Sequence, residues 1–303
     1  MIKYFKRTIK DNHIRIISGL EIGCWVNVVN PTSDEIDYLV KKFRLDKRNL
    51  ESGLDQNEIP RFDSVGNDNY FFAKNVPIKQ KGEIETYLIV ITERFILTLS
   101  KTEPNFIIKI LEGKINCITT QKLKCLIKLF SLMNEGFERL TVELVKKVQA
   151  ERKPVRELEE KELNILLEQE NILSNLVSSY HYMNLLYDRT VRRVKFFEQD
   201  KEIIEDLITE ATQGLNICKS SLKTISNLRS YYVIFLSNRL NKIITIFTVF
   251  TIFISIPAAI SGIYGMNLLL PFAENPSAFY YLMIAIGGIW IGFILYLKKK
   301  RII

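Results

Sequence analysis

Two long uncharged segments stand out near the end of the chain. Residues 243–263 carry no charged side chain, and neither do residues 278–297. As helices these segments each rise about 30 Å, at about 1.5 Å per residue, which is enough to cross the hydrocarbon core of a bilayer. The pattern predicts two membrane-spanning helices. The alternative, a buried hairpin of a soluble core, requires the rest of the protein to cover both helices on every face.

Positive charge flanks both predicted spans on the same side. Arg239 and Lys242 precede the first span and the basic residues 298–301 follow the second, whereas residues 264–277 between the spans contain no Lys or Arg. By the positive-inside rule, both termini lie in the cytoplasm and the protein is a multi-pass protein of the cell membrane. Residues 1–10 are basic but no apolar run follows them, so we expect no signal peptide.

The region before the first span changes character near residue 120. Ahead of this point the polar cluster 30–35 has the capping residues that begin a helix, which we expect to run to about Phe43. Short runs of strand composition occur at 24–29, 70–73, 86–92 and 94–99. After about Leu123 the periodicity is that of long helices, two of them antiparallel around Pro154 and a third leading into the membrane.

These patterns predict an α+β membrane protein with six consecutive parts. A cytoplasmic α/β domain is joined by a long helical stalk to the two spans. The predicted bounds are 1–120 for the α/β domain, 121–242 for the long-helix region and stalk, 243–264 for transmembrane helix 1, 265–277 for the outer loop, 278–297 for transmembrane helix 2 and 298–303 for a basic cytoplasmic tail.

Composition and charge argue against several classes of function. The net charge of +8 is modest and both signs mix along the helical stretches, so we expect no nucleic-acid partner. With two histidines and no CxxC pair, a structural zinc cluster is not expected. Glycine-rich phosphate loops are absent and no catalytic constellation emerges, so we expect no enzyme activity and no bound cofactor. The widely spaced cysteines are expected to be reduced intracellular thiols: Cys24, Cys117, Cys125 and Cys218.

A polar stripe runs along the first predicted span. At about 100° per residue, its polar side chains fall on one face, with Thr251 just outside the arc. The other members are Asn238, Asn241, Thr245, Thr248 and Ser255. Such a stripe favours a pore only weakly, because short hydroxyl side chains also bond to their own helix or pack against a neighbour. One or two copies of this helix cannot enclose a water-filled path, whereas a ring of copies can.

The end of the first span carries a motif with a specific setting. Gly265, Met266 and Asn267 follow Pro257 and the segment 261–264, and they precede a short loop, a second span and a basic tail. In this setting the sequence resembles the CorA-type divalent metal ion transporters, whose signature is the Gly-Met-Asn triplet. The N-terminal half is similar to the family's opening pattern too, in Trp25-Val26-Asn27-Val28, Pro31-Thr32, Asp55, Glu58, Pro60 and Arg61, with Asp63 where Glu is more usual.

The resemblance implies a funnel-shaped homopentamer in the lipid bilayer, with the first span of each copy lining one axial pore. Asn267 is then the outer selectivity ring, where neutral oxygens hold hydrated Mg²⁺ through its first-shell waters. Gly265 avoids crowding at the helix end, and Met266 packs rather than binds the hard cation. The family's pore-lining positions correspond to Asn241, Thr248, Thr251 and Ser255, and its hydrophobic constriction to Ile244 and Phe247.

Two acidic residues are further candidates. Glu274 in the outer loop would attract divalent cations to the mouth, although a solvated loop charge is an equal alternative. In the family, cytosolic Mg²⁺ held by carboxylates between neighbouring cytoplasmic domains keeps the pore shut. Asp206 corresponds to one such ligand, with Glu202, Glu205 and Glu210 close by. A solvated acidic helix face is the alternative for each of them.

The resemblance implies Mg²⁺ transport driven by the membrane potential and gated by cytoplasmic Mg²⁺. Mg²⁺ is then both the transported and the regulatory ion, and Co²⁺ or Ni²⁺ are possible further substrates. The sequence leaves two alternatives open. One is a Zn²⁺ transporter of the same superfamily, and the other is a two-span membrane sensor that conducts no ion.

Overall fold

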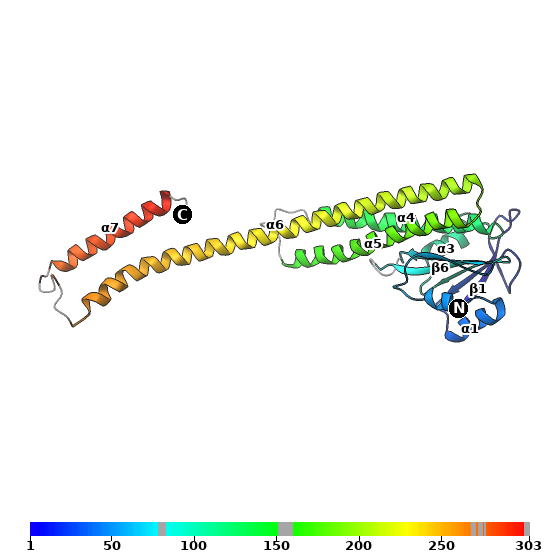
Figure 1. Cartoon of the computed structure of the whole chain (residues 1–303), viewed down its shortest axis with the longest axis horizontal. Helices are drawn as coiled ribbons and strands as arrows, with labels where there is room; N and C mark the ends of the chain where they lie inside the picture. The colour runs from blue at the N-terminus through cyan, green and yellow to red at the C-terminus, as the bar shows by residue number, and fades with distance from the viewer. Residues whose placement is uncertain (78–82, 151–159, 268–270, 272–274, 276, 300–303) are drawn as a thin grey trace. The chain divides into compact units, whose positions relative to one another are not determined.

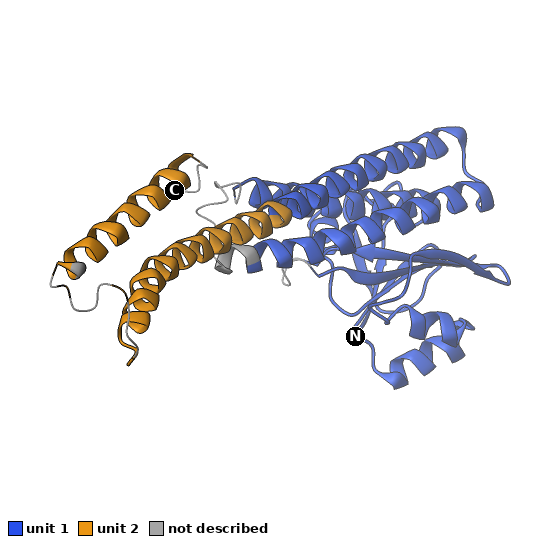
Figure 2. Cartoon of the chain, turned by 60° about the vertical axis from the view of Figure 1, so that its left-hand side comes forward, with its two compact units in different colours: residues 1–228 blue, residues 229–303 orange. Residues whose placement is uncertain are grey.

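The computed structural model describes the chain except for residues 78–82, 151–159, 268–270, 272–274, 276 and 300–303. It divides into two compact units, Met1–Leu228 and Arg229–Ile303, which Figure 2 distinguishes by colour. The division lies ahead of the predicted boundary between stalk and span at 242/243. The last buried side chain along the third long helix is Ile225, so this helix leaves the core of the first unit before it becomes apolar.

A seven-stranded sheet forms the centre of the first unit, with the strand order β2-β1-β3-β7-β6-β5-β4. Neighbouring strands are antiparallel except β3 and β7, which are parallel. The strand bounds are β1 Ile2–Lys6, β2 Arg15–Ile17, β3 Trp25–Val29, β4 Arg61–Val65, β5 Asp68–Asn75, β6 Glu85–Ile91 and β7 Ile96–Ser100. The runs predicted as strands therefore became β3, β5, β6 and β7, and the predicted α/β domain is confirmed.

The sheet separates two hydrophobic cores because successive side chains on a strand point to opposite faces. In β6, Tyr87 and Ile89 belong to the core beneath the long helices, whereas Leu88 and Val90 belong to the core beneath α1 (Ser33–Phe43) and α2 (Lys47–Ser52). All four are fully buried. Figure 1 shows α1 on one side of the sheet and the long helices on the other, namely α4 (Lys122–Ala150), α5 (Glu160–Arg193) and the first part of α6 (Glu198–Tyr264).

The short helices are α1 (Ser33–Phe43), α2 (Lys47–Ser52) and α3 (Asn105–Leu111). Thr32 caps α1 as the polar cluster predicted: its hydroxyl accepts from the Glu35 backbone N–H, and the Glu35 carboxylate accepts from the Thr32 backbone N–H. This reciprocal capping box satisfies two backbone donors at the start of the helix. The predicted end of the helix at Phe43 is confirmed too, and Arg44 follows it in the left-handed conformation.

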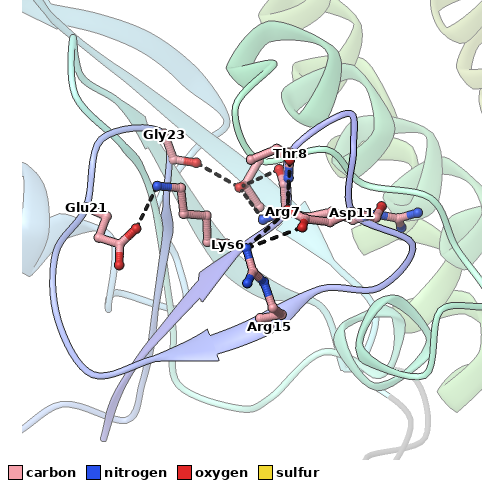
Figure 3. A network of polar contacts seen from close by, with 8 residues as sticks. Lys6, Arg7, Thr8, Asp11, Arg15, Glu21 and Gly23 are labelled. Atoms are coloured by element: carbon pink, nitrogen blue, oxygen red, sulfur yellow. Dashed lines mark hydrogen bonds and ion pairs between the residues drawn. The ribbon is translucent and has the colours of Figure 1, made fainter.

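A polar network joins the sheet edge to the connection that precedes α4, as Figure 3 shows. The Thr119 hydroxyl accepts from the Arg7 backbone N–H at 3.0 Å and donates to the Gly23 carbonyl at 2.7 Å. Nearby, Lys6 pairs with Glu21. The Asp11 carboxylate accepts from the Thr8 backbone N–H, and this hydrogen bond holds the pKa of Asp11 below its usual value. The network ties three segments that are far apart in sequence.

Three long helices complete the first unit: α4 (Lys122–Ala150), α5 (Glu160–Arg193) and α6 (Glu198–Tyr264), of which residues up to Leu228 belong to this unit. The predicted long-helix region is confirmed, while the bend at Pro154 lies outside the described residues. Tyr180 of α5 passes over Gly214 of α6 and hydrogen-bonds to the Thr141 hydroxyl of α4 at 3.1 Å. A glycine is required at 214 because a Cβ there would lie 2.8 Å from Tyr180 Cε1.

Gly214→Ala is therefore expected to destabilise the chain, by about 1–3 kcal/mol, since overpacking forces Tyr180 to move. Tyr180 has little freedom to do so, because its ring packs on Phe137 with 5.2 Å between centroids and its hydroxyl is bonded to Thr141. Thermal unfolding of the full chain in detergent measures the effect. Gly136→Ala is the matched control: a Cβ there lies 3.8 Å from the nearest atom, so this variant should be neutral or more stable.

The expectation that all four cysteines are reduced is wrong. The structure joins Cys117 and Cys125 in a disulfide, with 5.5 Å between their Cα atoms. A spacing of eight residues does not by itself indicate a pair, but the connection between α3 and α4 brings Cys117 next to Cys125 in the first turn of α4. Cys24 and Cys218 are free and buried.

The second unit contains the end of α6, from Arg229, and α7 (Ala278–Lys299). Each of these two helices has an 18-residue apolar window, with mean hydropathy 2.4 on α6 and 1.9 on α7. None of the window on α6 is buried, and 11% of that on α7 is. A hairpin hidden in a soluble core would be covered, whereas these windows are open within the second unit. Both helices have the length and composition of membrane spans.

Candidate functional site: a polar face on the first apolar helix

The hydroxyl groups of the polar stripe all bond to their own helix. Thr245, Thr248 and Thr251 each donate to the carbonyl four residues earlier at 2.8 Å. Ser255 donates to the Ile252 carbonyl at 3.1 Å. This is the arrangement expected for hydroxyl side chains in a membrane helix. The hydroxyl protons are therefore already used in hydrogen bonds, while the lone pairs of the hydroxyl oxygens remain available as acceptors on the helix surface.

The packing of α7 shows which face of α6 lies opposite the polar stripe. Phe253 lies against Trp290 and Phe293, with ring centroids 5.3 and 6.0 Å apart. Thr251 and Ser255, two residues before and after Phe253, point about 160° away from it at about 100° per residue. Both are exposed, as are Thr248 and Asn241, whereas Thr245 is half-buried. The four predicted pore-lining residues therefore share a surface that α7 leaves open.

Two large apolar side chains, Ile244 and Phe247, interrupt the open surface near its N-terminal end. Ile244 is 61% exposed and Phe247 is 66% exposed. Both residues precede Thr248 by less than two helical turns. The Thr248 hydroxyl donates to the Ile244 carbonyl, and the Thr251 hydroxyl donates to the Phe247 carbonyl. A ring of such residues contributed by several chains has the composition of a hydrophobic constriction. Their role as a gate stays a prediction, since a gate of this kind would require contacts between several chains.

The triplet lies directly at the end of α6, which terminates at Tyr264. The Gly265 N–H donates to the Ser261 carbonyl at 2.9 Å and the Met266 N–H to the Ile263 carbonyl at 3.2 Å. A Cβ on Gly265 would lie 3.1 Å from the same Ser261 oxygen, so the absence of a side chain permits this tight helix end. Met266 and Asn267 are exposed. Glu274, the predicted cation attractant, lies outside the described residues.

Asp206 is exposed on the part of α6 that belongs to the first unit. Its helix buries the other face, through Ile204, Leu207 and Ala211. Glu202, Glu205 and Glu210 are exposed as well. Nowhere in the described part of the chain do three or more His, Cys, Asp or Glu side chains gather as metal ligands. A metal site at Asp206 therefore needs ligands from another chain or from water.

Glu210 also borders a cavity of about 320 Å³ between α4, α5 and α6, which Glu138 of α4 lines as well. Burial raises the pKa of the Tyr180 hydroxyl well above its usual value, and the Glu138 carboxylate adds to the effect. The hydroxyl therefore stays protonated and keeps its hydrogen bond to Thr141. The cavity is bounded by the residues that hold the three helices together.

Sequence reasoning missed the residues that orient the stripe. Phe253 and Trp290 decide which face of α6 meets α7, and neither was singled out. A signal was present, because Phe253 lies between Thr251 and Ser255 and Trp290 is the only tryptophan in the two apolar segments. The pairing of these two rings, however, depends on how the helices pack.

Comparisons with known proteins agree with the arrangement. A family model described as "CorA-like Mg2+ transporter protein" matches residues 21–299. The curated "Cobalt/magnesium transport protein CorA" of Methanocaldococcus jannaschii is 24% identical over 282 residues, covering 86% of this chain and 84% of that protein.

Two solved structures share the fold over nearly the whole chain. The complete structure of the CorA magnesium transporter from Methanocaldococcus jannaschii covers 98% of this chain and 97% of its own, with TM-score 0.83 and 18% identity. The full-length CmaX protein covers 99% and 96%, with TM-score 0.76 and 15% identity. At these identities the structural matches establish the fold.

Proposed function

Since the chain belongs to the family of CorA-like Mg²⁺ transporter proteins, we propose that it conducts Mg²⁺ across the cell membrane through an axial pore. The first span, residues 243–264, lines this pore in each copy of a homopentamer. The membrane potential drives the ion, and both termini lie in the cytoplasm. The basic residues that flank the spans support this orientation.

The observation that carries the proposal is the open face of α6 with the triplet at its end. Waters bound to Mg²⁺ donate hydrogen bonds outward, so a hydrated ion is best received by acceptors. The hydroxyls of Thr248, Thr251 and Ser255 already donate hydrogen bonds to carbonyls of their own helix. Their oxygens are therefore left as acceptors. A ring of such oxygens lets Mg²⁺ pass with its inner waters, which it gives up reluctantly.

Asn267 and Asn241 lie at the two ends of the proposed ion path. At the outer end, the Asn267 amide oxygens hold the hydrated ion and select it. At the cytoplasmic end, Asn241 offers a second ring of amide oxygens, followed by the constriction of Ile244 and Phe247. Dewetting at the constriction closes the path. Glu274 raises the local concentration of divalent cations at the outer mouth.

Asp206 is the proposed regulatory residue. Mg²⁺ bound between Asp206 and a neighbouring copy neutralises carboxylates that otherwise repel one another, and loss of the ion allows the ring to rearrange. The exposure of Asp206 supports a ligand role between chains. One or two carboxylates for each ion suffice, because Mg²⁺ keeps several waters in its coordination shell.

Gly265→Ala is expected to lower Mg²⁺ uptake about tenfold, since the new Cβ at 3.1 Å from the Ser261 oxygen displaces the triplet. Initial uptake rates in proteoliposomes measure the effect. Gly288→Ala on α7 is the control, because a Cβ there meets no atom within 4 Å in the described part of the chain and the substitution leaves α6 and the triplet unchanged. Equal rates for Gly265→Ala and wild type would show that the geometry of this helix end has no part in conduction.

Ion preference tests the proposal as a whole. The purified chain in liposomes is given Mg²⁺, Co²⁺, Ni²⁺ or Zn²⁺ in turn, with and without a proton gradient. We expect Mg²⁺ uptake that is independent of the proton gradient, with Co²⁺ as a second substrate. Zn²⁺ uptake that requires the gradient would assign the chain to zinc transport instead. Failure to move any of the four ions would leave the non-conducting sensor.

A further inference from the structure

A polar cavity of about 380 Å³ lies within the first unit, between α5 and the segment that precedes β4. Residues 56–60 form part of its wall, and they belong to the segment that resembles the family's opening pattern. The proposed function gives this polar cavity no role. Amide and hydroxyl side chains make up half of its lining: Gln56, Asn57, Asn175, Ser178, Ser179 and Tyr182. Such a lining suits a ligand that makes many hydrogen bonds.

The polar cavity is also lined by a buried cation, Lys74 of β5, which is only 8% exposed. Its ammonium donates to the Gln56 carbonyl and to the Thr86 hydroxyl. An ammonium has three protons, so one of them has no acceptor among the described residues, and Lys74 forms no ion pair there. Burial lowers the pKa of Lys74, and the carboxylates of Asp55 and Glu58 offset this only in part. An anion in the polar cavity would compensate the buried charge.

A second buried donor lines the same polar cavity. Ser179 of α5 is 7% exposed, and its hydroxyl has no hydrogen-bond partner among the described residues. The Thr190 hydroxyl of the same helix, in contrast, donates to the Leu186 carbonyl at 2.7 Å. The Ser179 oxygen is not sealed inside the protein, as the unpaired Gln169 Oε1 is, so it is reached from the polar cavity. Its proton is free to be donated to a ligand.

We propose that the polar cavity binds a phosphate group, with the Lys74 ammonium and the Ser179 hydroxyl as donors at its buried end. The oxygens of a phosphate point in several directions, so they can accept from donors on separate elements, here β5, α5 and residues 56–60. A carboxylate has two oxygens in one plane and serves fewer of these donors. The volume is in the range of small-molecule sites, so the remaining space suits the polar body of a phosphorylated small molecule.

Two carboxylates also line the polar cavity, and neither neutralises Lys74. Glu58 forms an ion pair with Arg61, which pairs with Asp63 as well, at 2.8 Å. Glu83 is exposed, so water and salt screen its charge. The two side chains at the buried end, Lys74 and Ser179, are both hydrogen-bond donors. The buried end is therefore the part that receives the anion.

Phosphate binding tests this site without reference to transport, so the result does not depend on the proposed function. Equilibrium dialysis of the purified full-length chain in detergent, with radiolabelled inorganic phosphate and no Mg²⁺, measures the affinity and the stoichiometry. We expect saturable binding of one phosphate per chain, displaced by glucose 6-phosphate but not by equal concentrations of glucose or acetate. Absence of saturable binding overturns the proposal. Displacement by acetate as effective as that by glucose 6-phosphate overturns the assignment to phosphate.

Substitutions at the buried end locate the site. Ser179→Ala should raise the Kd for phosphate about tenfold, and Lys74→Met should raise it at least as much, since each removes a hydrogen bond to a charged ligand. Ser174→Ala on the same helix and Lys146→Met on α4 are the matched controls, because both residues are exposed and lie outside the polar cavity.

Both controls should bind phosphate as the wild type does. Wild-type affinity in Ser179→Ala, or an equal loss in Lys74→Met and Lys146→Met, would show that phosphate binds elsewhere. If Lys74→Met does not fold, Ser179→Ala alone decides, because the Ser179 hydroxyl forms no hydrogen bond with the described part of the chain.

Discussion

Asn267→Ala is expected to reduce Mg²⁺ uptake about tenfold or more while the oligomer still assembles. The substitution removes one amide oxygen from each copy, and hydrogen bonds around a charged species are worth about 1.5–3 kcal/mol each. The side chain is exposed at the end of α6, so its loss leaves no cavity within the chain. Uptake into proteoliposomes measures the rate, and size-exclusion chromatography with light scattering measures the assembly.

Asn275→Ala is the matched control for this prediction. Asn275 follows in the same outer loop, and its side chain accepts from the Ser277 N–H at 3.0 Å. Its removal changes an amide outside the triplet, so uptake should stay within about twofold of the wild type. An Asn267→Ala protein that transports at the wild-type rate would refute the assignment of Asn267 to the selectivity ring.

Asp206→Lys is expected to protect the stalk from proteolysis even when Mg²⁺ is removed with EDTA. The lysine supplies a fixed positive charge in place of the bound ion, so the carboxylates of neighbouring copies no longer repel one another. The wild type should become cleavable in EDTA and resistant in Mg²⁺. Chymotrypsin is the suitable protease, because the new lysine would itself create a site for trypsin.

Glu205→Lys separates a local site from a general charge effect. Glu205 is the adjacent exposed carboxylate on the same helix, and the substitution changes the charge by the same amount. We expect it to keep the Mg²⁺-dependent protection of the wild type. If Asp206→Lys and the wild type show the same dependence on Mg²⁺, Asp206 is not the sensor. If both variants protect equally, the response follows the total charge of the helix.

The fold was predictable where one segment carries a strong pattern. The strands β5 to β7 are almost wholly buried and each contains a run of apolar residues, and α4 buries side chains at a helical period. Sequence reasoning missed β1, β2 and β4, which are short strands at or near the sheet edges. Most of their residues are half-buried or exposed, as in Arg61-Phe62-Asp63-Ser64-Val65. A strand of this kind is defined by the neighbour with which it pairs, because its own composition is mixed.

The candidate site, too, could be predicted from the sequence only where a single helix carries the pattern. Helical geometry alone placed Thr248 and Ser255 on one face, and both lie on the surface that α7 leaves open. The stripe also included Thr245, which the structure makes half-buried. Which face of α6 meets α7 depends on the contact between Phe253 and Trp290, and no period along one helix contains that information. The Cys117–Cys125 disulfide was missed for a similar reason, since a turn in the chain brings the two residues together.

The potential dependence of Mg²⁺ uptake tests the central claim most directly. Liposomes containing the purified wild-type chain, a Mg²⁺-sensitive dye and a potassium gradient are treated with valinomycin to set an inside-negative potential. A passive pore predicts uptake that rises steeply with the imposed potential, since a divalent ion gains about 4.6 kcal/mol from each 100 mV. An uptake rate equal to that of protein-free liposomes at every potential would contradict the account.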